Sequence, residues 1–286
     1  MRMTKIVRRL LLTVLTAAVI VGTLPAMTLN VSAASTQGLE TRTYTQSELR
    51  SYDKSHPVQR PDYSFSQQPS VTAPYALGAV SNDCLQDALN LLNLYRMIAG
   101  TEPVQITQSA QRYAQAGALN CAIRNYLDHD QSTPSDMDSE MAAWAAHGMQ
   151  YSNLAGGGRS LTDTITRYML ETNGDPAFGH RRHLLKYDLS EVGFGVAEST
   201  KGNCYMSAYV GTTRREDKVM SYPGVNQPIE FFGPGYAWTV IVPQNITQSS
   251  VRVKITDTKT GKTWDFSTSQ GNLKIYEGTF GAMSLS

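Results

Sequence analysis

Two neighbouring segments organise this chain: Gly179-His180-Arg181-Arg182-His183-Leu184-Leu185, followed by Val192-Gly193-Phe194-Gly195-Val196-Ala197. The second part places a large apolar residue at every other position with glycine or alanine between, and a period of two is typical of a β-strand. Because one face of this strand carries almost no side chains, a helix or a ligand can approach its backbone closely. The first segment reads as a short turn of helix that carries His180 and His183 and leads into this strand. A titratable side chain is therefore expected where the end of a helix meets the edge of a sheet.

Helical patterns precede this strand, and strand patterns follow it. Small polar residues that favour helix N-caps mark four helix starts, at Ser81, at Thr107 or Ser109, at Ser135, and at Ser160 or Thr162. A second strand over 204–210 completes an antiparallel hairpin with the first. Helices gathered before strands predict an α+β layered domain from about residue 81 to residue 215.

The texture of the sequence changes in its last part, over residues 220–286, where short strands alternate with turn residues. This pattern predicts a small all-β unit of the sandwich type. At roughly 65 residues such a unit is small to fold alone, so we expect it to pack on the first domain.

Residues 1–33 have the pattern of a secretory signal peptide. Four basic residues precede an apolar run from Leu10 to Leu24, and small residues stand before Ala34. Pro25 ends this run, which is shorter than the roughly 20 apolar residues of a membrane-spanning helix. We therefore expect export, cleavage near Ala33 and a secreted, extracellular mature protein without a membrane anchor.

The segment 34–80, between this leader and the first helix, shows no lasting helical or strand period. It is rich in Ser, Thr, Gln and Tyr and is interrupted by four prolines. A segment with so little apolar surface to bury is expected to be extended and poorly ordered.

The charge balance excludes one class of partner. The full chain has a net charge of +1, and without the four basic residues of the leader 21 Lys and Arg stand against 24 Asp and Glu, a net charge of −3. A surface that binds nucleic acid or anionic membranes is therefore not predicted. The expected partner is an extracellular ligand or protein whose identity the sequence does not reveal.

Three cysteines, Cys84, Cys121 and Cys204, lie in the part of the chain that is to be exported. Because the first two helices are joined by a short loop, they are expected to run antiparallel, which brings Cys84 level with Cys121. Export supplies an oxidising setting, so we predict a disulfide between these two residues and a buried thiol at Cys204. An odd count leaves at least one thiol unpaired or paired between molecules.

The familiar hydrolase and nucleotide-binding motifs are absent: the sequence lacks HExxH, GxSxG and a dinucleotide fingerprint. Gly156–Gly158 lack the context of a phosphate-binding loop and predict a flexible connector. His147 fits a favourable charge at a helix end, whereas His129 and His180 lie at element boundaries beside loops. His180 and His183 can share a helix face, but without a third nearby ligand they are weak support for a metal site. From spacing alone, a functional and a purely structural role for these histidines stay equally open.

The order of several short motifs is similar to that of the CAP superfamily. They are Asn93-x-x-Arg96-x-x-x-Gly100, Leu127-Asp128-His129, Ser152-Asn153-Leu154, Gly179-His180-Arg181 and Val192-Gly193-Phe194-Gly195. This superfamily groups the cysteine-rich secretory, antigen 5 and pathogenesis-related proteins, and the chain resembles its bacterial SCP-like branch over residues 82–212. The resemblance implies an α-β-α sandwich, which agrees with the layers expected above.

The resemblance also implies a cleft lined by two histidines and two acidic residues. Carried over to this sequence, the histidines are His129 and His180, which in the family can bind a divalent metal such as Zn²⁺, and one acid is Glu171. The second acid belongs immediately before Asn153, where this chain has Ser152. The implied lining of the cleft is therefore His129, Ser152, Asn153, Glu171 and His180. Since two imidazoles and one carboxylate are the minimum for an open zinc site, the lack of the second acid is expected to lower the affinity for cations.

Two functions are compatible with this cleft. In the first, the protein is an extracellular binding or interaction module that holds a small ligand or a divalent metal. In the second, it is a metal-dependent extracellular hydrolase, a peptidase or an esterase, in which a metal bound by His129 and His180 polarises a carbonyl and Glu171 acts as base. Ser152 favours the binding module, and so does the C-terminal β-unit, which adds surface but no obvious catalytic residue.

Overall fold

The structure is a computed structural model that describes residues 42–171, 178–211, 219–232, 236–242, 253–267, 273–276 and 281–285. The expected signal peptide lies outside these residues and stays a prediction. Within the described residues, no helix combines the length and the apolar character that crossing a bilayer requires.

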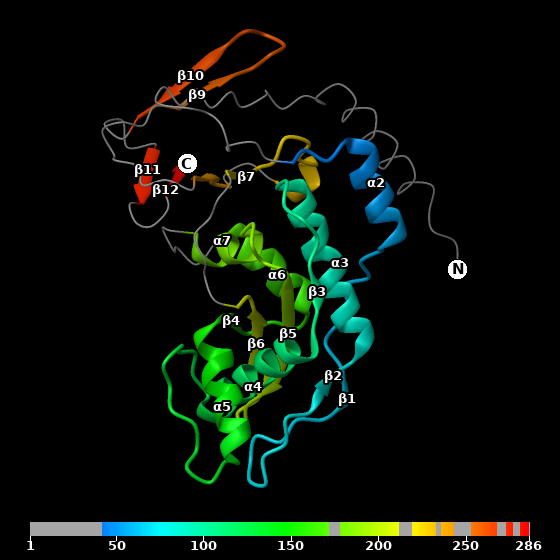
Figure 1. Cartoon of the computed structure of the whole chain (residues 1–286), viewed down its shortest axis with the longest axis vertical. Coiled ribbons are helices and arrows are strands. Elements are labelled where there is room, and N and C mark those ends of the chain that lie inside the picture. Colours follow the sequence, from blue (N-terminus) through cyan, green and yellow to red (C-terminus); the bar gives the residue numbers. More distant parts are fainter. Residues whose placement is uncertain are drawn as a thin grey trace.

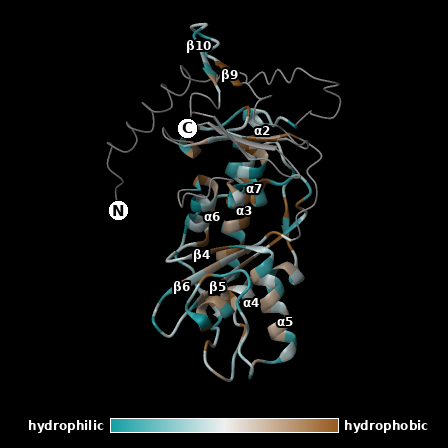
Figure 2. Ribbon diagram, turned by 90° about the vertical axis from the view of Figure 1, so that its left-hand side faces the viewer, coloured by the Kyte–Doolittle hydropathy of each residue, from teal (hydrophilic) through white to brown (hydrophobic). Residues whose placement is uncertain are grey.

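A four-stranded sheet forms the centre of the molecule. Its strands, in sheet order, are β3 (Gln105–Ile106), β5 (Glu191–Glu198), β6 (Cys204–Tyr209) and β4 (Ser152–Gly156). β3 runs parallel to β5, and the other neighbours are antiparallel. One face is covered by α4 (Gln108–Arg124) and α5 (Ser139–Gln150). The other face carries α3 (Asn82–Ile98), α6 (Leu161–Leu170) and α7 (Gly179–Leu185), as Figures 1 and 2 show. The predicted α-β-α sandwich is confirmed.

Strand β5 has the two faces that its alternation predicts. Val192, Phe194 and Val196 are buried in the core together with residues of α3 and α6. Gly193 and Gly195 face α4, where an added Cβ would lie 2.1 and 2.2 Å from carbonyl oxygens of the helix. The lack of side chains on this face therefore lets α4 pack directly on the strand backbone.

Helix α4 also completes one edge of β5. Strand β3 pairs with only the first two residues of β5. Further along, the side-chain amide of Gln111 binds the N–H and C=O groups of Phe194 at 3.0 and 2.6 Å, and Gln115 does the same for Val196 at 3.1 and 2.8 Å. Because residues four apart share one helix face, the two glutamines follow β5 as a neighbouring strand would, and they protect its edge.

The predicted Cys84–Cys121 disulfide is wrong, because the three cysteines are free and buried. Cys84 lies in α3 and belongs to the core on one face of the sheet, whereas Cys121 lies in α4 and belongs to the core on the opposite face. The prediction assumed that helices joined by a short loop pack side by side. Here the loop contains β3, which joins the sheet and brings α4 to its far face. Cys204 is a buried thiol, as expected.

We expect alkylation to find three free thiols in the mature chain when it is unfolded without reductant. Burial raises the pKa of Cys121 to about 12 and the pKa of Cys204 to about 11. Since the thiolate is the reactive form, the native chain should react much more slowly than the unfolded one. Intact-mass spectrometry checks both statements, and a mass with a single alkylated cysteine would restore the disulfide.

Residues 42–80 are not the extended, poorly ordered leader that their composition predicts. They contain α2 (Gln46–Ser55) and a small antiparallel pair, β1 (Phe65–Gln67) with β2 (Ala79–Val80). Thr45 begins α2 with a capping box: its Oγ accepts the N–H of Glu48 at 3.2 Å, and its own N–H donates to the Glu48 carboxylate at 2.7 Å. The pattern Thr-x-x-Glu is a recognised helix start, and it was the signal in the sequence that could have revealed α2.

This N-terminal segment is fastened along α3. Tyr44 and Leu49 are buried against the apolar side chains near the end of that helix. Further along, the carboxylate of Asp87 accepts the N–H groups of Gln59 and Arg60, both at 2.7 Å. Residues 42–63 therefore form a belt over α3 that the amphipathic pattern of the helix alone does not show.

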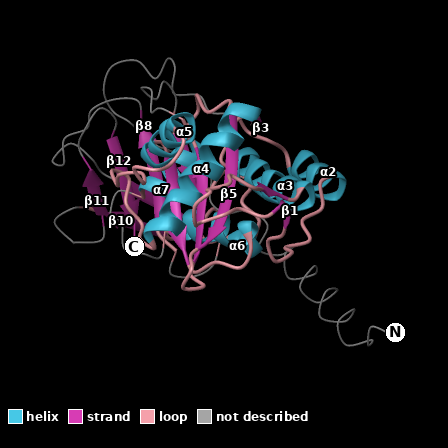
Figure 3. Cartoon of the chain, turned by 90° about the horizontal axis from the view of Figure 1, so that it is seen from below, coloured by secondary structure: helices cyan, strands magenta, loops and turns pink. Residues whose placement is uncertain are grey.

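In the described residues of the C-terminal part, the elements are the predicted short strands and one turn of 3-10 helix, η1 (Ile229–Phe231). A four-stranded antiparallel sheet has the order β11 (Leu273–Tyr276), β12 (Gly281–Leu285), β8 (Trp238–Val242) and β7 (Met220–Tyr222). A separate hairpin consists of β9 (Val253–Thr256) and β10 (Thr263–Phe266). Figure 3 shows β8, β11 and β12 gathered at one side of the molecule. Face-to-face packing of two sheets into a sandwich stays a prediction.

The described start of this unit packs on the first domain. Met220, Tyr222 and Ile241 belong to the same buried cluster as residues of α3 and α6. The ring of Tyr95 in α3 lies 6.2 Å from the ring of Tyr222 and 5.4 Å from that of Phe231, in edge-to-face arrangements. The unit therefore shares its apolar core with the sandwich, as its small size led us to expect.

Candidate functional site

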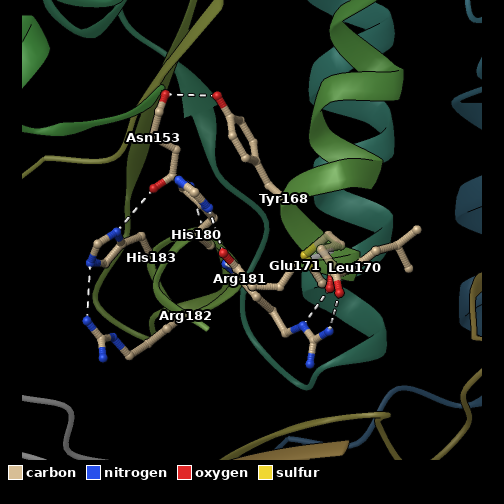
Figure 4. A network of polar contacts seen from close by, with 9 residues as sticks. Asn153, Tyr168, Leu170, Glu171, His180, Arg181, Arg182 and His183 are labelled. Carbon is tan, nitrogen blue, oxygen red and sulfur yellow. Dashed lines mark hydrogen bonds and ion pairs between the residues drawn. The ribbon is translucent and has the colours of Figure 1, made fainter. Parts of the chain in front are cut away.

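The candidate site lies where the end of α6, the start of α7 and the edge strand β4 come together (Figure 4). Helix α6 ends at Leu170, and Glu171 follows with a left-handed backbone, φ 53°. A positive φ is uncommon for a residue other than glycine, and one residue in this conformation is a frequent way for a helix to end. The turn directs the Glu171 side chain inward, where it is fully buried.

Glu171 and His180 form a hydrogen-bonded pair. Oε1 of Glu171 lies 2.6 Å from Nδ1 of His180, and Oε2 accepts the N–H of Arg181 at 2.9 Å. Both carboxylate oxygens of Glu171 are therefore buried and hydrogen-bonded. This geometry does not favour the role of a base that the hydrolase alternative gives to Glu171. The carboxylate instead holds a proton on Nδ1 and fixes the ring, so that Nε2 is the nitrogen available for a ligand or a proton. The His180 side chain keeps 21% of its surface exposed, so it can be reached from solvent.

Two residues of the surrounding frame hold His180 in place. The ring of Tyr168 lies 4.9 Å from the imidazole ring, and its hydroxyl donates to the carbonyl of Asn153 at 3.0 Å. The side-chain amide of Asn153 donates to the carbonyl of His180 at 2.9 Å. Asn153, which the resemblance placed in the cleft, therefore ties strand β4 to the first turn of α7.

His183 belongs to the same network, although the resemblance did not supply it. Its Nδ1 lies 3.1 Å from Oδ1 of Asn153, and its Nε2 lies 3.5 Å from a guanidinium nitrogen of Arg182. Burial, and then the positive charges of Arg182 and Lys186, lower the pKa of His183 to about 3. The ring is therefore neutral near pH 7 and serves as a fixed hydrogen-bonding group. Its spacing of three from His180 was the signal in the sequence.

His129 lies in the loop after α4. Its charge contributes to the lowered pKa of His183 after those of Arg182, Lys186 and His180. Nδ1 of His129 lies 2.7 Å from the carbonyl oxygen of Met149 near the end of α5, which leaves Nε2 as the outward nitrogen. His129 is exposed in the loop after α4. The groove that was expected between His129 and His180 stays a prediction.

Ser152 does not share the surroundings of Asn153. Successive strand residues point to opposite faces, so Ser152 faces the layer of α4 and α5, whereas Asn153 faces α6 and α7. Ser152 is 4% exposed, and its hydroxyl oxygen has no hydrogen-bond partner among the described residues. It contributes no charge where the family resemblance places a second acid.

The residues of the site fall short of a complete metal site. No group of three or more His, Cys, Asp or Glu side chains in the described part of the chain has the arrangement of a metal site. Two imidazoles are present, but both oxygens of Glu171 are bound to groups of α7. Two imidazoles alone are fewer than the three protein ligands of a typical open zinc site, so a resident metal does not fit these residues.

Comparisons with known proteins agree with the resemblance in the motifs. Residues 89–210 match the model of the cysteine-rich secretory protein family, abbreviated CAP. A curated protein of Bacillus subtilis (strain 168), described as "Uncharacterized protein YkwD", is 23% identical over 185 residues, which cover 64% of this chain and 67% of its own length. The region that matches the family begins within α3 and ends after β6, so it contains the whole candidate site.

Proposed function

The chain is a member of the CAP superfamily through its domain at residues 89–210, and we propose from this premise that it is an exported binding module. Its ligand would be held at the edge of the sheet by His180, with His129 on the opposite side. The leader pattern in the sequence supports export, since its basic residues, apolar run and small residues are those of a signal peptide.

The observation that carries this proposal is the fixed orientation of His180. Its Nδ1 is bound to the buried Glu171 carboxylate at 2.6 Å, and Tyr168 packs against its ring. A ring held on two sides loses little conformational freedom when a ligand binds to Nε2, and such preorganisation favours binding.

The charges around the site favour a ligand with an anionic group, such as a carboxylate. Arg182 and Lys186 carry positive charges that contribute to the lowered pKa of His183. The negative charge of Glu171 is already engaged by His180 and the N–H of Arg181, so these two cations favour an anionic ligand. Both these cations and the incomplete ligand set oppose a tightly bound metal.

We expect nuclear magnetic resonance of the mature chain, labelled at histidine, to show this preference. Acetate, as the simplest carboxylate probe, should shift the ring signals of His180 and His129 at millimolar concentration, as suits so small a ligand. Zn²⁺ should bind with a dissociation constant weaker than about 1 µM, a free energy of about −8 kcal/mol. His180→Ala should abolish the acetate response at His129.

A matched control is His147→Gln. His147 packs among tyrosine rings away from this network, with its Nε2 3.0 Å from the hydroxyl of Tyr209. This variant should respond to acetate as the unaltered chain does. Acetate shifts that are equal in His180→Ala and in the control would show that the site does not bind the probe.

The hydrolase remains a second candidate because a carboxylate that orients a histidine also occurs in enzymes. In that case His180, and not Glu171, would accept the proton. Peptide and ester substrates should be turned over by the unaltered chain, and His180→Ala should lose the activity. Such a result, or submicromolar Zn²⁺ binding that depends on both histidines, would replace the binding module.

A further inference from the structure

Arg181 lies between the candidate site and the C-terminal sheet. It is 1% exposed, and its guanidinium group donates to both sides. On the sandwich side, Nε binds the carbonyl of Met169 at 2.5 Å and Nη2 binds that of Leu170 at 3.4 Å. On the side of the C-terminal sheet, Nη1 binds the carbonyl of Ala237 at 3.0 Å and the hydroxyl of Thr239 at 3.2 Å.

The contacts on the sandwich side reach the last turn of α6. The final carbonyl groups of a helix have no partner within the helix, and a positive charge there is favourable. The Arg181 side chain therefore stabilises the turn that leads directly into Glu171. Its own backbone N–H also donates to the Glu171 carboxylate at 2.9 Å. Any displacement of Arg181 thus acts on the acid that orients His180.

The contacts on the other side come from β8 and β7. Besides the acceptors of β8 and the residue before it, the ring of Tyr222 in β7 lies 4.9 Å from the guanidinium carbon. The ring of Phe178, which precedes α7 on the sandwich side, lies 4.8 Å from it. A buried cation is tolerated only where hydrogen-bond acceptors and aromatic faces replace water. The C-terminal sheet supplies part of this replacement, so the place of Arg181 depends on the docking of that sheet.

We propose that the C-terminal β-sheet is a working part of the candidate site, because its docking fixes the Glu171–His180 pair through the positioning residue Arg181. This coupling between docking of the C-terminal sheet and the orientation of His180 is a property of the fold and goes beyond the binding role. Its effect on ligand affinity rests on the proposed function. Undocking of the sheet would remove acceptors from Arg181, loosen the end of α6 and release the orientation of His180.

The test uses Thr239→Val in the full mature chain, because this change deletes one hydroxyl of the C-terminal sheet and nearly keeps the side-chain shape. The reporter is the His180 Nδ1 proton, which should exchange slowly with solvent while Glu171 binds it. We expect exchange to become about tenfold faster, the order of the contribution of one hydrogen bond to a charged group. Arg181→Met should give a larger effect if the variant folds.

Ser221→Ala is the matched control, since Ser221 lies in the adjacent strand β7 opposite Val240, and its hydroxyl is not among the described partners of Arg181. It should leave the His180 proton unchanged. The amide proton of Ala118, which is buried in α4, reports global stability. Equal acceleration of the Ala118 amide in Thr239→Val, or an unchanged His180 proton, would overturn the coupling.

The acetate titration separates this inference from the proposed function. A chain that does not bind acetate but shows faster exchange at His180 in Thr239→Val keeps the coupling and loses the binding role. If the unaltered chain and Thr239→Val bind acetate equally well and the His180 Nδ1 proton exchanges at the same rate in both, the binding role stands and the coupling is overturned.

Discussion

Gly193→Ala should destabilise the protein by about 3 kcal/mol or more, at the upper end of the usual cost of overpacking a core. The added methyl group would lie 2.1 Å from the carbonyl oxygen of Ala110. This neighbour is the backbone of α4, not the end of a flexible side chain, so the helix must move away from β5. That movement would also stretch the hydrogen bonds between Gln111 and Phe194. Chemical unfolding monitored by circular dichroism measures the loss.

Gly156→Ala is the matched control. Gly156 is a strand glycine of the same sheet and, by the alternation of the strands, on the same face as Gly193. Its added Cβ would meet the Cδ1 atom of Leu127 at 3.5 Å and the carbonyl oxygen of Cys204 at 3.8 Å, both ordinary contacts. We expect this variant to change stability by less than about 1 kcal/mol. Similar losses in both variants would mean that close packing of α4 is not what requires glycine at position 193.

Arg96→Met should cost about 3–5 kcal/mol, because it leaves several buried carbonyl groups without their donor. Arg96 is 0% exposed. Its guanidinium group binds the carbonyls of Leu184 at 2.7 Å and Leu189 at 3.2 Å, and with them fixes the connection from α7 to β5. Nε binds the carbonyl of Glu102 at 2.7 Å. A single residue of α3 thus holds two loops, and unfolding by denaturant should show their loss.

The matched control is Arg112→Met, since Arg112 is partly exposed on α4 and its guanidinium carbon lies 4.4 Å from the ring centroid of Trp144. An exposed contact of this kind contributes about 0.5–1 kcal/mol. Arg96→Lys should recover only part of the stability, because an ammonium group cannot reach acceptors in several directions as the planar fork does. A loss below about 1 kcal/mol in Arg96→Met would contradict the role given to these contacts.

The alternation from Val192 to Ala197 was sufficient to predict both the strand and its bare face, because period and residue size are local properties. The pairing of Cys84 with Cys121 failed for a different reason. It depended on where α4 lies, and the sheet residues that separate α4 from α3 follow some 80 positions later in the chain. Contacts of this range have no signature in the pattern of either helix.

In the candidate site, too, short local motifs were predictable from the sequence and contacts between distant residues were not. His129, His180 and Glu171 could be named from the order of short motifs, and the family match confirms the resemblance. The engagement of both Glu171 oxygens could not, because it depends on the turn at φ 53° and on the N–H of Arg181. The hydrogen bonds from Arg181 to Ala237 and Thr239 could not be predicted either, because these acceptors lie more than 50 residues away in the sequence.

The belt of residues 42–63 packs on the domain but lies outside the region that matches the family. The region that matches the family begins at residue 89, inside α3, and lacks the belt. The belt and the C-terminal part also meet each other, because the side-chain amide of Asn226 donates to the carbonyl of Tyr44 at 2.7 Å. Cut at the limits of the family region, the domain would expose apolar residues of α3 that the belt and the β7–β8 region now cover. The region shared with the family is therefore smaller than the unit that we expect to fold cooperatively.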